Sequence, residues 1–247
     1  MKNNLVELQN ISKSFGKTLV LDELSLEVKE NDTSGYKAIT KLQELKAYID
    51  QAISAGLVAY DSECDSLDTL SAKMIGFSLC YEKGKAVYIP IQQSSQDLFN
   101  QTEYIEEKDA LEQLIRLFTD SKVKIIMHNA KFDLKLLLAR WKKITKADNF
   151  DFNLLNLNLS DTMIIAWLLN PEHLGKNGYS LEYLGETMLG LKGIEFKDIV
   201  QKGQTFADVA LENAYKYAAE DADFTYQLYL NLKEKWDKEK YEAKCYE

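Results

Sequence analysis

The sequence is poor in the residue types that mark several common kinds of protein. Its 247 residues include only three cysteines and two histidines. Cys64, Cys80 and Cys245 are odd in number and widely spaced, so neither a disulfide framework nor a zinc knuckle is indicated. His128 and His173 are likewise too few and too far apart to suggest a zinc site. This cysteine usage favours a reducing, cytoplasmic compartment.

Long apolar runs are also missing from the chain. The longest purely apolar run is Met163–Leu169, whereas a membrane-spanning helix needs about 20 apolar residues. The N-terminal segment MKNNLVELQN lacks the apolar core of a secretory signal. We therefore expect no membrane partner and no secretion signal.

The chain has no excess of positive charge, because its formal net charge is −9. This balance argues against coating nucleic acid by bulk electrostatics, although a short strand end could still be held in a cleft through bound cations. One local basic stretch is explained most simply as a solvated helix face. It consists of Lys131, Lys135, Arg140, Lys142, Lys143 and Lys146.

The first part of the chain, residues 1–35, differs from the rest. It alternates like strand material and is superficially similar to the opening strands of an ATP-binding-cassette domain. That family requires a glycine-rich phosphate loop, GxxxxGK[ST], which occurs nowhere in the sequence, so ATP binding is excluded. We interpret residues 1–35 as an N-terminal extension of uncertain role and residues 36–247 as the main domain.

From residue 36 onward, strand and helix patterns alternate. Such alternation predicts an α/β fold in which a sheet is flanked by helices. A glycine, Gly56, is positioned to end the first helix, and the segment Glu82–Gly84 has the composition of a hairpin turn. We expect one helix that ends at Gly56 and further helices over 106–118, 131–141 and 211–236. We expect strands around 57–62, 73–91 and 122–128.

The stretch LVAYDSECDSLD, residues 57–68, begins like a buried strand and ends in a cluster of acids. Residues two apart point to the same face of a strand, so Asp61 and Glu63 would project together. Taken alone, this D-x-E pattern is weak evidence, and a solvated polar turn is the simpler explanation. Asp161 is read as the N-cap of a helix that begins at Thr162.

Two further short motifs carry acids. Asn129 follows an apolar strand as a plausible N-cap, and Asp133 lies in the first helical turn, where an acid favours the helix dipole. Tyr217 and Asp221 are four residues apart, on one face of the long final helix. Each motif in isolation has a simple structural explanation.

Together the four acids suggest a metal site. If Asp61, Glu63, Asp133 and Asp221 converged, they would repel strongly unless cations lay between them. Their hard oxygen ligands suit Mg²⁺ or Mn²⁺. Two such ions stabilise the attacking and leaving oxygens of a phosphoryl transfer, and Tyr217 could hold the attacking water.

The order and flanking text of these motifs resemble a known family. The segments VAYDSECDSLDTLSAKMIGFSL, IIMHNAKFDLKLL and YAAEDADFTYQL are similar to the three motifs of the 3′–5′ proofreading exonuclease domain of bacterial family A DNA polymerases (the DNA polymerase I family). That domain belongs to the tyrosine branch, DEDDy, of the DEDD exonuclease superfamily. The resemblance covers residues from about 36 to 236, roughly four-fifths of the chain.

The resemblance implies a ribonuclease H-like mixed α/β fold, with a central sheet flanked by helices, and two divalent cations, Mg²⁺ or Mn²⁺. Several residues would bind metal or position water: Asp61, Glu63 and Asp221 at one ion, Asp133 and the bridging Asp61 at the other, and Tyr217 beside the nucleophilic water. Three would contact nucleic acid: Leu67 as a wedge against the terminal bases, Asn129, and Phe132. Phe132 replaces the tyrosine expected there, which removes a hydroxyl and keeps the ring.

The resemblance leads us to expect a 3′–5′ exonuclease that acts on single-stranded or frayed DNA and releases nucleoside 5′-monophosphates. An exoribonuclease of the same superfamily and a catalytically silent nucleic-acid-binding module are the alternatives. A DNA polymerase, in cis or in trans, is the expected protein partner. Of the remaining residues, Cys64 is read as a filler that points away from the metals, and Phe150 and Phe152 as packing residues.

Overall fold

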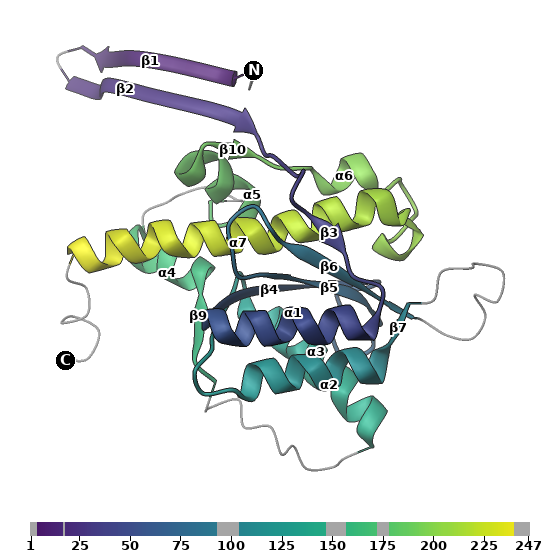
Figure 1. Cartoon of the computed structure of the whole chain (residues 1–247). Coiled ribbons are helices and arrows are strands. Elements are labelled where there is room, and N and C mark those ends of the chain that lie inside the picture. Colours follow the sequence, from purple (N-terminus) through teal and green to yellow (C-terminus); the bar gives the residue numbers. More distant parts are fainter. Residues whose placement is uncertain (1–3, 17, 93–103, 147–156, 172–177, 240–247) are drawn as a thin grey trace.

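The computed structural model describes residues 4–16, 18–92, 104–146, 157–171 and 178–239. Its body is a central mixed sheet with helices on both faces (Figure 1), as the sequence predicted. Among the described residues, no helix is both long and apolar enough to cross a membrane. Phe150, Phe152, His173 and Cys245 lie outside the described residues.

The central sheet has the strand order β3-β6-β5-β4-β8-β9, and β7 pairs with β6. Strand β4 lies inside the sheet, antiparallel to β5 and parallel to β8. The seven strands are β3 (Lys37–Ala38), β4 (Leu57–Cys64), β5 (Met74–Cys80), β6 (Val87–Gln92), β7 (Ile105–Glu106), β8 (Lys124–Met127) and β9 (Leu159–Asp161).

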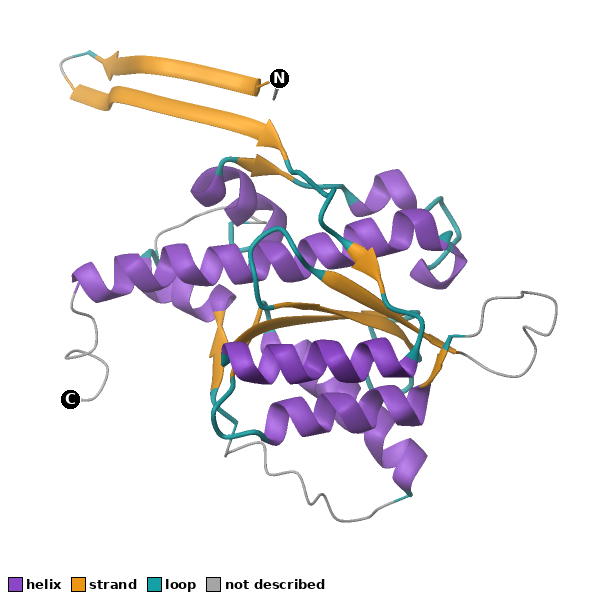
Figure 2. Cartoon of the chain, in the orientation of Figure 1, coloured by secondary structure: helices purple, strands orange, loops and turns teal. Residues whose placement is uncertain are grey.

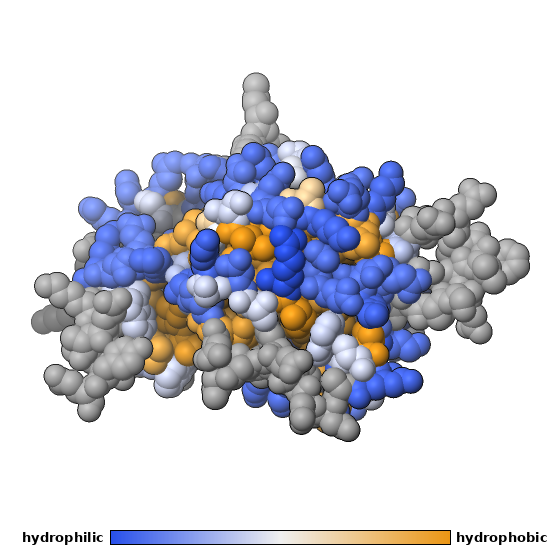
Figure 3. Space-filling view, turned by 60° about the horizontal axis from the view of Figure 1, so that its bottom comes forward, coloured by the Kyte–Doolittle hydropathy of each residue, from blue (hydrophilic) through white to orange (hydrophobic). Residues whose placement is uncertain are grey.

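Helices cover both faces of this sheet (Figure 2). One face carries α1 (Leu42–Ala55), α2 (Glu107–Thr119) and α3 (Ala130–Thr145), and the other carries the long α7 (Leu211–Glu239). The surface on the side of α1 and α2 is largely hydrophilic, with apolar side chains visible between charged ones (Figure 3). The shorter elements are α4 (Thr162–Leu169), α5 (Leu181–Leu184), a π-helix η2 (Gly185–Leu189), β10 (Leu191–Lys192), α6 (Phe196–Ile199) and a 3₁₀ turn η3 (Phe206–Asp208).

Strand β4 alternates strictly between the two faces. Val58 and Tyr60 belong to the core formed with α1, α2 and α3. Ala59, between them, packs with Ala219 and Ala222 of α7. This alternation continues along the strand and determines which way its terminal acids point.

Most of the predicted elements are confirmed. Helix α1 ends at Gly56, whose φ of 73° closes the helix in the left-handed conformation that glycine adopts easily. Strands β5 and β6 are joined across the expected turn, and α4 begins after Asp161. Helix α3 is longer than predicted, because it continues past residue 141 to Thr145.

Residues 1–35 contain the expected strand material, arranged as an antiparallel hairpin of β1 (Asn4–Phe15) and β2 (Thr18–Glu30). The hairpin projects from the body (Figure 1), and β2 pairs with β10. Just after it, Asn31 donates hydrogen bonds to the Tyr36 hydroxyl at 2.8 Å and to Glu220 of α7 at 2.9 Å.

Candidate active site

Three carboxylates converge between strand β4 and helix α7. Asp61 and Glu63 continue the face of β4 on which Ala59 meets α7, so both side chains point toward that helix. Asp221 of α7 completes the group, and one oxygen from each carboxylate lies within 4.8 Å of those of the other two. Acids up to 160 residues apart in the sequence thus form one compact cluster, which is the arrangement expected of a cation site.

The three carboxylates are poorly compensated by the protein itself. Burial raises the pKa of Asp61, Glu63 and Asp221 well above the ordinary range, and the charges of neighbouring acids raise it further. Glu63 is only 9% exposed, and among the described residues its buried Oε1 has no hydrogen-bond partner. An orphaned carboxylate oxygen beside two other acids suits a divalent cation, which would supply the missing positive charge.

The fourth acid, Asp133, lies close by but outside this group of three. It is 3% exposed and accepts hydrogen bonds from the Ser62 backbone N–H at 3.1 Å and the Ser62 hydroxyl at 2.5 Å. Ser62 alternates to the opposite face of β4 from Asp61 and Glu63, which explains the separation. Burial raises the pKa of Asp133 to about 7, although the Ser62 hydrogen bonds oppose that rise.

Tyr217 lies one helical turn before Asp221, as the spacing predicted. The charge of Asp221, followed by burial, raises the pKa of the Tyr217 phenol far above its usual value, so the hydroxyl keeps its proton. Its ring packs against Phe196 and Phe206, with centroids 5.9 Å away in both cases. These contacts hold the phenol beside the carboxylates.

All four acids and Tyr217 line one cleft with a volume of about 540 Å³. Asn129 and Phe132, at the start of α3, line it as well, as do Tyr179 and Ser180. The remaining lining residues are Ser62, His128, Met163, Gly178 and Leu181. A cleft of this size, with acids at its base, has room for a small charged group such as a nucleotide.

The predicted N-cap position of Asn129 is confirmed, but its side chain is not the group that caps the helix. Asn129 occupies the N-cap position of α3 in a left-handed conformation, φ 64°, but its side chain makes no capping hydrogen bond. The cap is instead the Asp161 carboxylate, which accepts from the backbone N–H groups of Asn129 at 3.1 Å and Ala130 at 2.8 Å. The Asn129 side chain is thereby left for other contacts in the cleft.

Asp161 also has the role that the sequence predicted. As N-cap of α4 it accepts from the N–H groups of Met163 at 2.9 Å and Ile164 at 3.4 Å. The second helix that it caps was not predicted. Its partner residues lie about 30 positions earlier in the sequence, and only the pairing of β8 with β9 brings them near.

His128 has a structural environment, in agreement with the reading that it is no metal ligand. Its Nδ1 is 2.8 Å from the Thr162 hydroxyl and its Nε2 is 2.9 Å from the Tyr179 carbonyl oxygen. Burial lowers the pKa of His128, so the ring is neutral at physiological pH. The contact with Tyr179 fixes one wall of the cleft.

Leu67 lies on the loop 65–73 that follows β4. It is 89% exposed and does not line the cleft, so its role as a wedge stays a prediction. Cys64 packs against the core on the side of α1, α2 and α3, away from the acids, and its thiol is 3.1 Å from the Ser66 carbonyl oxygen. Burial raises the pKa of Cys64 to about 11, which leaves the thiol unreactive near neutral pH.

The basic stretch of α3 is only partly the solvated face that was predicted. Its five lysines are exposed. Arg140 is 8% exposed and forms a two-pronged ion pair with Glu107, so the prediction is wrong for this residue. Charge alone did not reveal the burial, because Glu107 belongs to a different helix.

Comparisons with known proteins agree with this geometry. A family model described as a 3′–5′ exonuclease matches residues 36–237. DNA polymerase I of Treponema pallidum (strain Nichols) is 34% identical, with the similarity covering 80% of this chain and 22% of the polymerase. The chain spans about a fifth of the length of the polymerases it matches.

Solved structures show the same ribonuclease H-like fold. Brucella melitensis NrnC with bound Mg²⁺ has a TM-score of 0.53 and 16% identity, covering 83% of this chain and 81% of NrnC. Escherichia coli RNase D, described as an exoribonuclease involved in structured RNA processing, also has a TM-score of 0.53. Its sequence is 15% identical, and the structural match covers 81% of this chain and 46% of the RNase D chain. At these identities the likeness concerns the fold alone.

Proposed function

The chain belongs to the family of 3′–5′ exonuclease domains of DNA polymerase I type, and on that premise we propose that it hydrolyses the terminal phosphodiester bond at the 3′ end of single-stranded or frayed DNA. The chain is thus a nuclease, and nucleoside 5′-monophosphates would be its products. The observation that carries the proposal is the compact group of Asp61, Glu63 and Asp221 that lines the cleft.

We assign the cofactor as two divalent cations, Mg²⁺ or Mn²⁺. Asp61, Glu63 and Asp221 would hold one ion, and Asp133 with Asp61 would hold the other. The unpartnered Glu63 oxygen and the raised pKa values support a cation among these acids. When bound, such ions lower the pKa of a coordinated water and stabilise charge on the attacking and leaving oxygens.

The remaining residues of the cleft would position the substrate and the water. The Tyr217 phenol, protonated and fixed by two aromatic rings, would orient the water for attack. Asn129 and Phe132, on the wall formed by α3, would contact the terminal nucleotide, and Leu67 would press against its base. Phe132 would do so through its ring alone, without a hydroxyl.

The polymerases that the chain matches suggest its context. Because the chain corresponds to about a fifth of those proteins, we propose that it removes nucleotides from strands made by a DNA polymerase, joined in cis or bound in trans. The acidic net charge agrees with a protein that holds a strand end through cations in a cleft rather than by a basic surface.

Degradation of a 3′-labelled single strand with Mg²⁺ or Mn²⁺ tests the proposal. We expect release of labelled mononucleotide, abolished by a chelator. The double variant Asp61→Ala with Glu63→Ala should lose about a thousandfold in rate, because a bound metal contributes several kcal/mol to transition-state stabilisation. Glu112→Ala, an exposed acid on α2, is the matched control and should be unaffected. Activity that survives the double substitution would overturn the assignment.

The same assay on matched RNA and DNA strands decides the substrate. We expect DNA to be degraded faster. A preference for RNA of more than about tenfold, which is about 1.4 kcal/mol in the barrier, would make the protein an exoribonuclease instead. Calorimetry that detects no divalent-cation binding, together with no degradation of either strand, would indicate a catalytically silent binding module.

A further inference from the structure

Two leucines on the loop that follows β4 are unusually exposed. Leu67 is 89% exposed and Leu70 is 80% exposed, the highest values among the large apolar side chains of the described residues. Both lie on the loop 65–73, directly after the strand that carries Asp61 and Glu63. Two leucines this exposed on one short loop form an apolar surface that a binding partner would cover.

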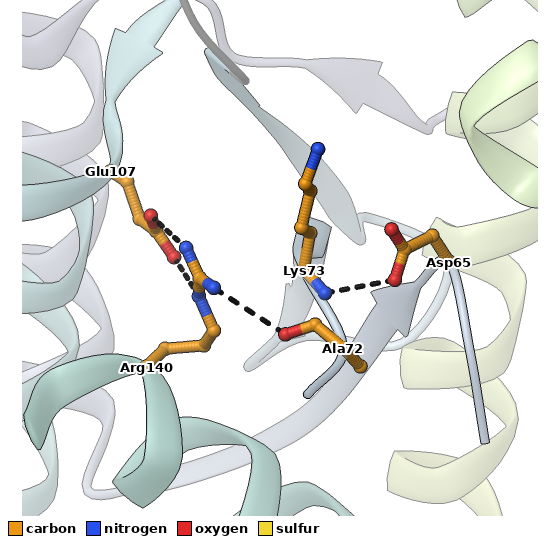
Figure 4. Close-up of polar contacts among 5 residues, drawn as sticks. All are labelled: Asp65, Ala72, Lys73, Glu107 and Arg140. Atoms are coloured by element: carbon orange, nitrogen blue, oxygen red, sulfur yellow. Dashed lines mark hydrogen bonds and ion pairs between the residues drawn. The ribbon is translucent and has the colours of Figure 1, made fainter. Parts of the chain in front are cut away.

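The loop itself is closed by specific hydrogen bonds. Where its two ends meet, the Lys73 backbone N–H donates to the Asp65 carboxylate at 2.8 Å (Figure 4). The Asp65 backbone N–H donates to the Lys73 carbonyl oxygen at 3.2 Å. Near its tip, Asp68 accepts from the Leu70 N–H at 3.2 Å and the Ser71 hydroxyl at 2.7 Å. The leucines are therefore presented by an ordered loop.

An ion pair beneath the loop anchors its second stem. Arg140 of α3 donates to both Glu107 oxygens, at 2.5 and 2.6 Å, and with a third nitrogen to the Ala72 carbonyl oxygen at 3.4 Å (Figure 4). The two charged side chains are only 10% and 18% exposed. A guanidinium held in this way has a fixed direction, so it fixes Ala72 relative to the helix that also carries Asp133.

The loop is within reach of a strand bound in the cleft. Cys64 and Met74 pair across β4 and β5, so both stems of the loop begin at the same place. Leu67 and Leu70 are three and four residues from that pair, at most about 14 Å along the chain. A strand whose 3′ end lies at Asp61 and Glu63 would bring its next bases past this loop.

Leu67 is already assigned to the terminal base. We propose that Leu70, on the same loop, packs against the unpaired bases further along the substrate strand, and that Arg140 is a positioning residue that holds the loop. This proposal rests on the proposed nuclease function. Bases have apolar faces that such side chains can cover, whatever the sequence. Because the chain as a whole is acidic, contacts to base faces would contribute much of the affinity for the strand.

Kinetics of Leu70→Ala on two substrates test the contact. A longer single strand of DNA would pass Leu70, whereas the p-nitrophenyl ester of thymidine 5′-monophosphate supplies only a terminal nucleotide and has no further bases. We expect Leu70→Ala to raise KM for the strand about tenfold with little change in kcat, since the burial of a leucine is lost. Hydrolysis of the ester should be unchanged.

Leu5→Ala is the matched control, because Leu5 is 45% exposed and lies on strand β1 of the projecting hairpin, none of whose described residues lines the cleft. It should leave both substrates unaffected. A KM for the strand within twofold of the native value in Leu70→Ala would overturn the contact. An equal loss on strand and ester would overturn it as well, because the effect would then arise at the carboxylates.

The role of Arg140 is tested by a double-mutant cycle. Arg140→Lys keeps the charge opposite Glu107 but cannot reproduce the guanidinium fork, and we expect it to raise KM for the strand while sparing the ester. Combined with Leu70→Ala, it should add little, because both changes disturb the same contact. Fully additive losses would overturn the positioning role.

Should Arg140→Lys not fold, Arg140→Met with Glu107→Leu replaces the pair by apolar residues without leaving a buried charge, and the same non-additivity is expected. Failure of the two hypotheses is distinguishable. A native protein that hydrolyses neither substrate overturns the proposed function and this inference together. If the native protein hydrolyses both substrates and Leu70→Ala leaves the kinetics on both unchanged, this inference alone is overturned.

Discussion

The carboxylate of Asp161 accepts hydrogen bonds from four backbone N–H groups, two at the start of α3 and two at the start of α4. One side chain thus satisfies the termini of two helices. Helix α3 carries Asp133, and Met163 of α4 lines the cleft. Asp161 therefore determines how two walls of the active site meet, although it lies outside the cleft itself.

Asp161→Ala should destabilise the protein by about 3 kcal/mol, since the loss of one N-cap costs about 1 kcal/mol or more and two caps are lost here. Urea denaturation followed by circular dichroism measures the change. The matched control is Ser180→Ala, which removes the single cap bond to the Tyr183 N–H at 3.3 Å and should cost about 1 kcal/mol or less. Equal losses in the two variants would contradict a double cap.

Residues with local roles were predictable, and those with partners distant in sequence were not. Asp161 before Thr162 is a cap that can be read from adjacent letters. Its second role depends on Met127 lying opposite it across β8 and β9. The burial of Arg140 depends in the same way on Glu107, which belongs to another helix.

Strands β4 and β5 form the element on which the site depends. Their register places Gly76 opposite Glu63 and Ser78 opposite Asp61. The ring of Tyr88 crosses over Gly76, so closely that a Cβ there would lie 2.3 Å from the Tyr88 hydroxyl and 2.5 Å from the ring. Glycine is thus required beside the clustered acids for a steric reason, and its φ is unexceptional.

Gly76→Ala should destabilise the protein by about 2 kcal/mol, because Tyr88 is buried and cannot move away freely. Nuclease activity should fall as well, since the shift occurs opposite Glu63. Thermal unfolding and the single-strand assay measure the two effects. Ser78→Ala, on the same face of β5, is the control. Among the described residues its buried hydroxyl has no partner, so its removal should cost nothing.

Element positions followed well from periodicity, while their ends and pairings did not. The strand and helix patterns of 57–62 and 211–236 correspond closely to β4 and α7. The hairpin of residues 1–35 also reads as strands, but its pairing with β10 joins segments about 160 residues apart. Such pairings depend on tertiary packing, which the alternation of one segment does not encode.

The convergence of the acids is a property of the whole molecule. Each of the three motifs had a sufficient local explanation, and only the resemblance to an exonuclease family predicted that Asp61, Glu63 and Asp221 would meet. The structure adds that Asp133 is held by Ser62 on the other side of β4. Bringing two buried and two partly buried acids together opposes folding at neutral pH in the absence of cations.

This opposition predicts how metal and pH act on stability together. Burial raises the pKa of the cleft acids, for Asp133 to about 7, above the values in the unfolded chain. The folded protein therefore holds more protons than the unfolded chain between about pH 4 and 7, and its stability falls as pH rises through that window. A cation replaces those protons, so the stabilisation by Mg²⁺ should grow with pH.

Thermal melting with chelator and with saturating Mg²⁺, at about pH 5 and about pH 8, measures this linkage. At pH 8 a ligand at a hundredfold excess over its Kd contributes about 2.7 kcal/mol, which raises Tm by roughly 5–10 °C for a chain of this length. At pH 5 protons compete for the same oxygens, and the rise should be much smaller. The variant Asp61→Asn with Glu63→Gln removes the competing charges and should melt independently of Mg²⁺ at both pH values. A Mg²⁺ effect that is equal at the two pH values, or retained in that variant, would show that the ion binds outside the carboxylate cluster.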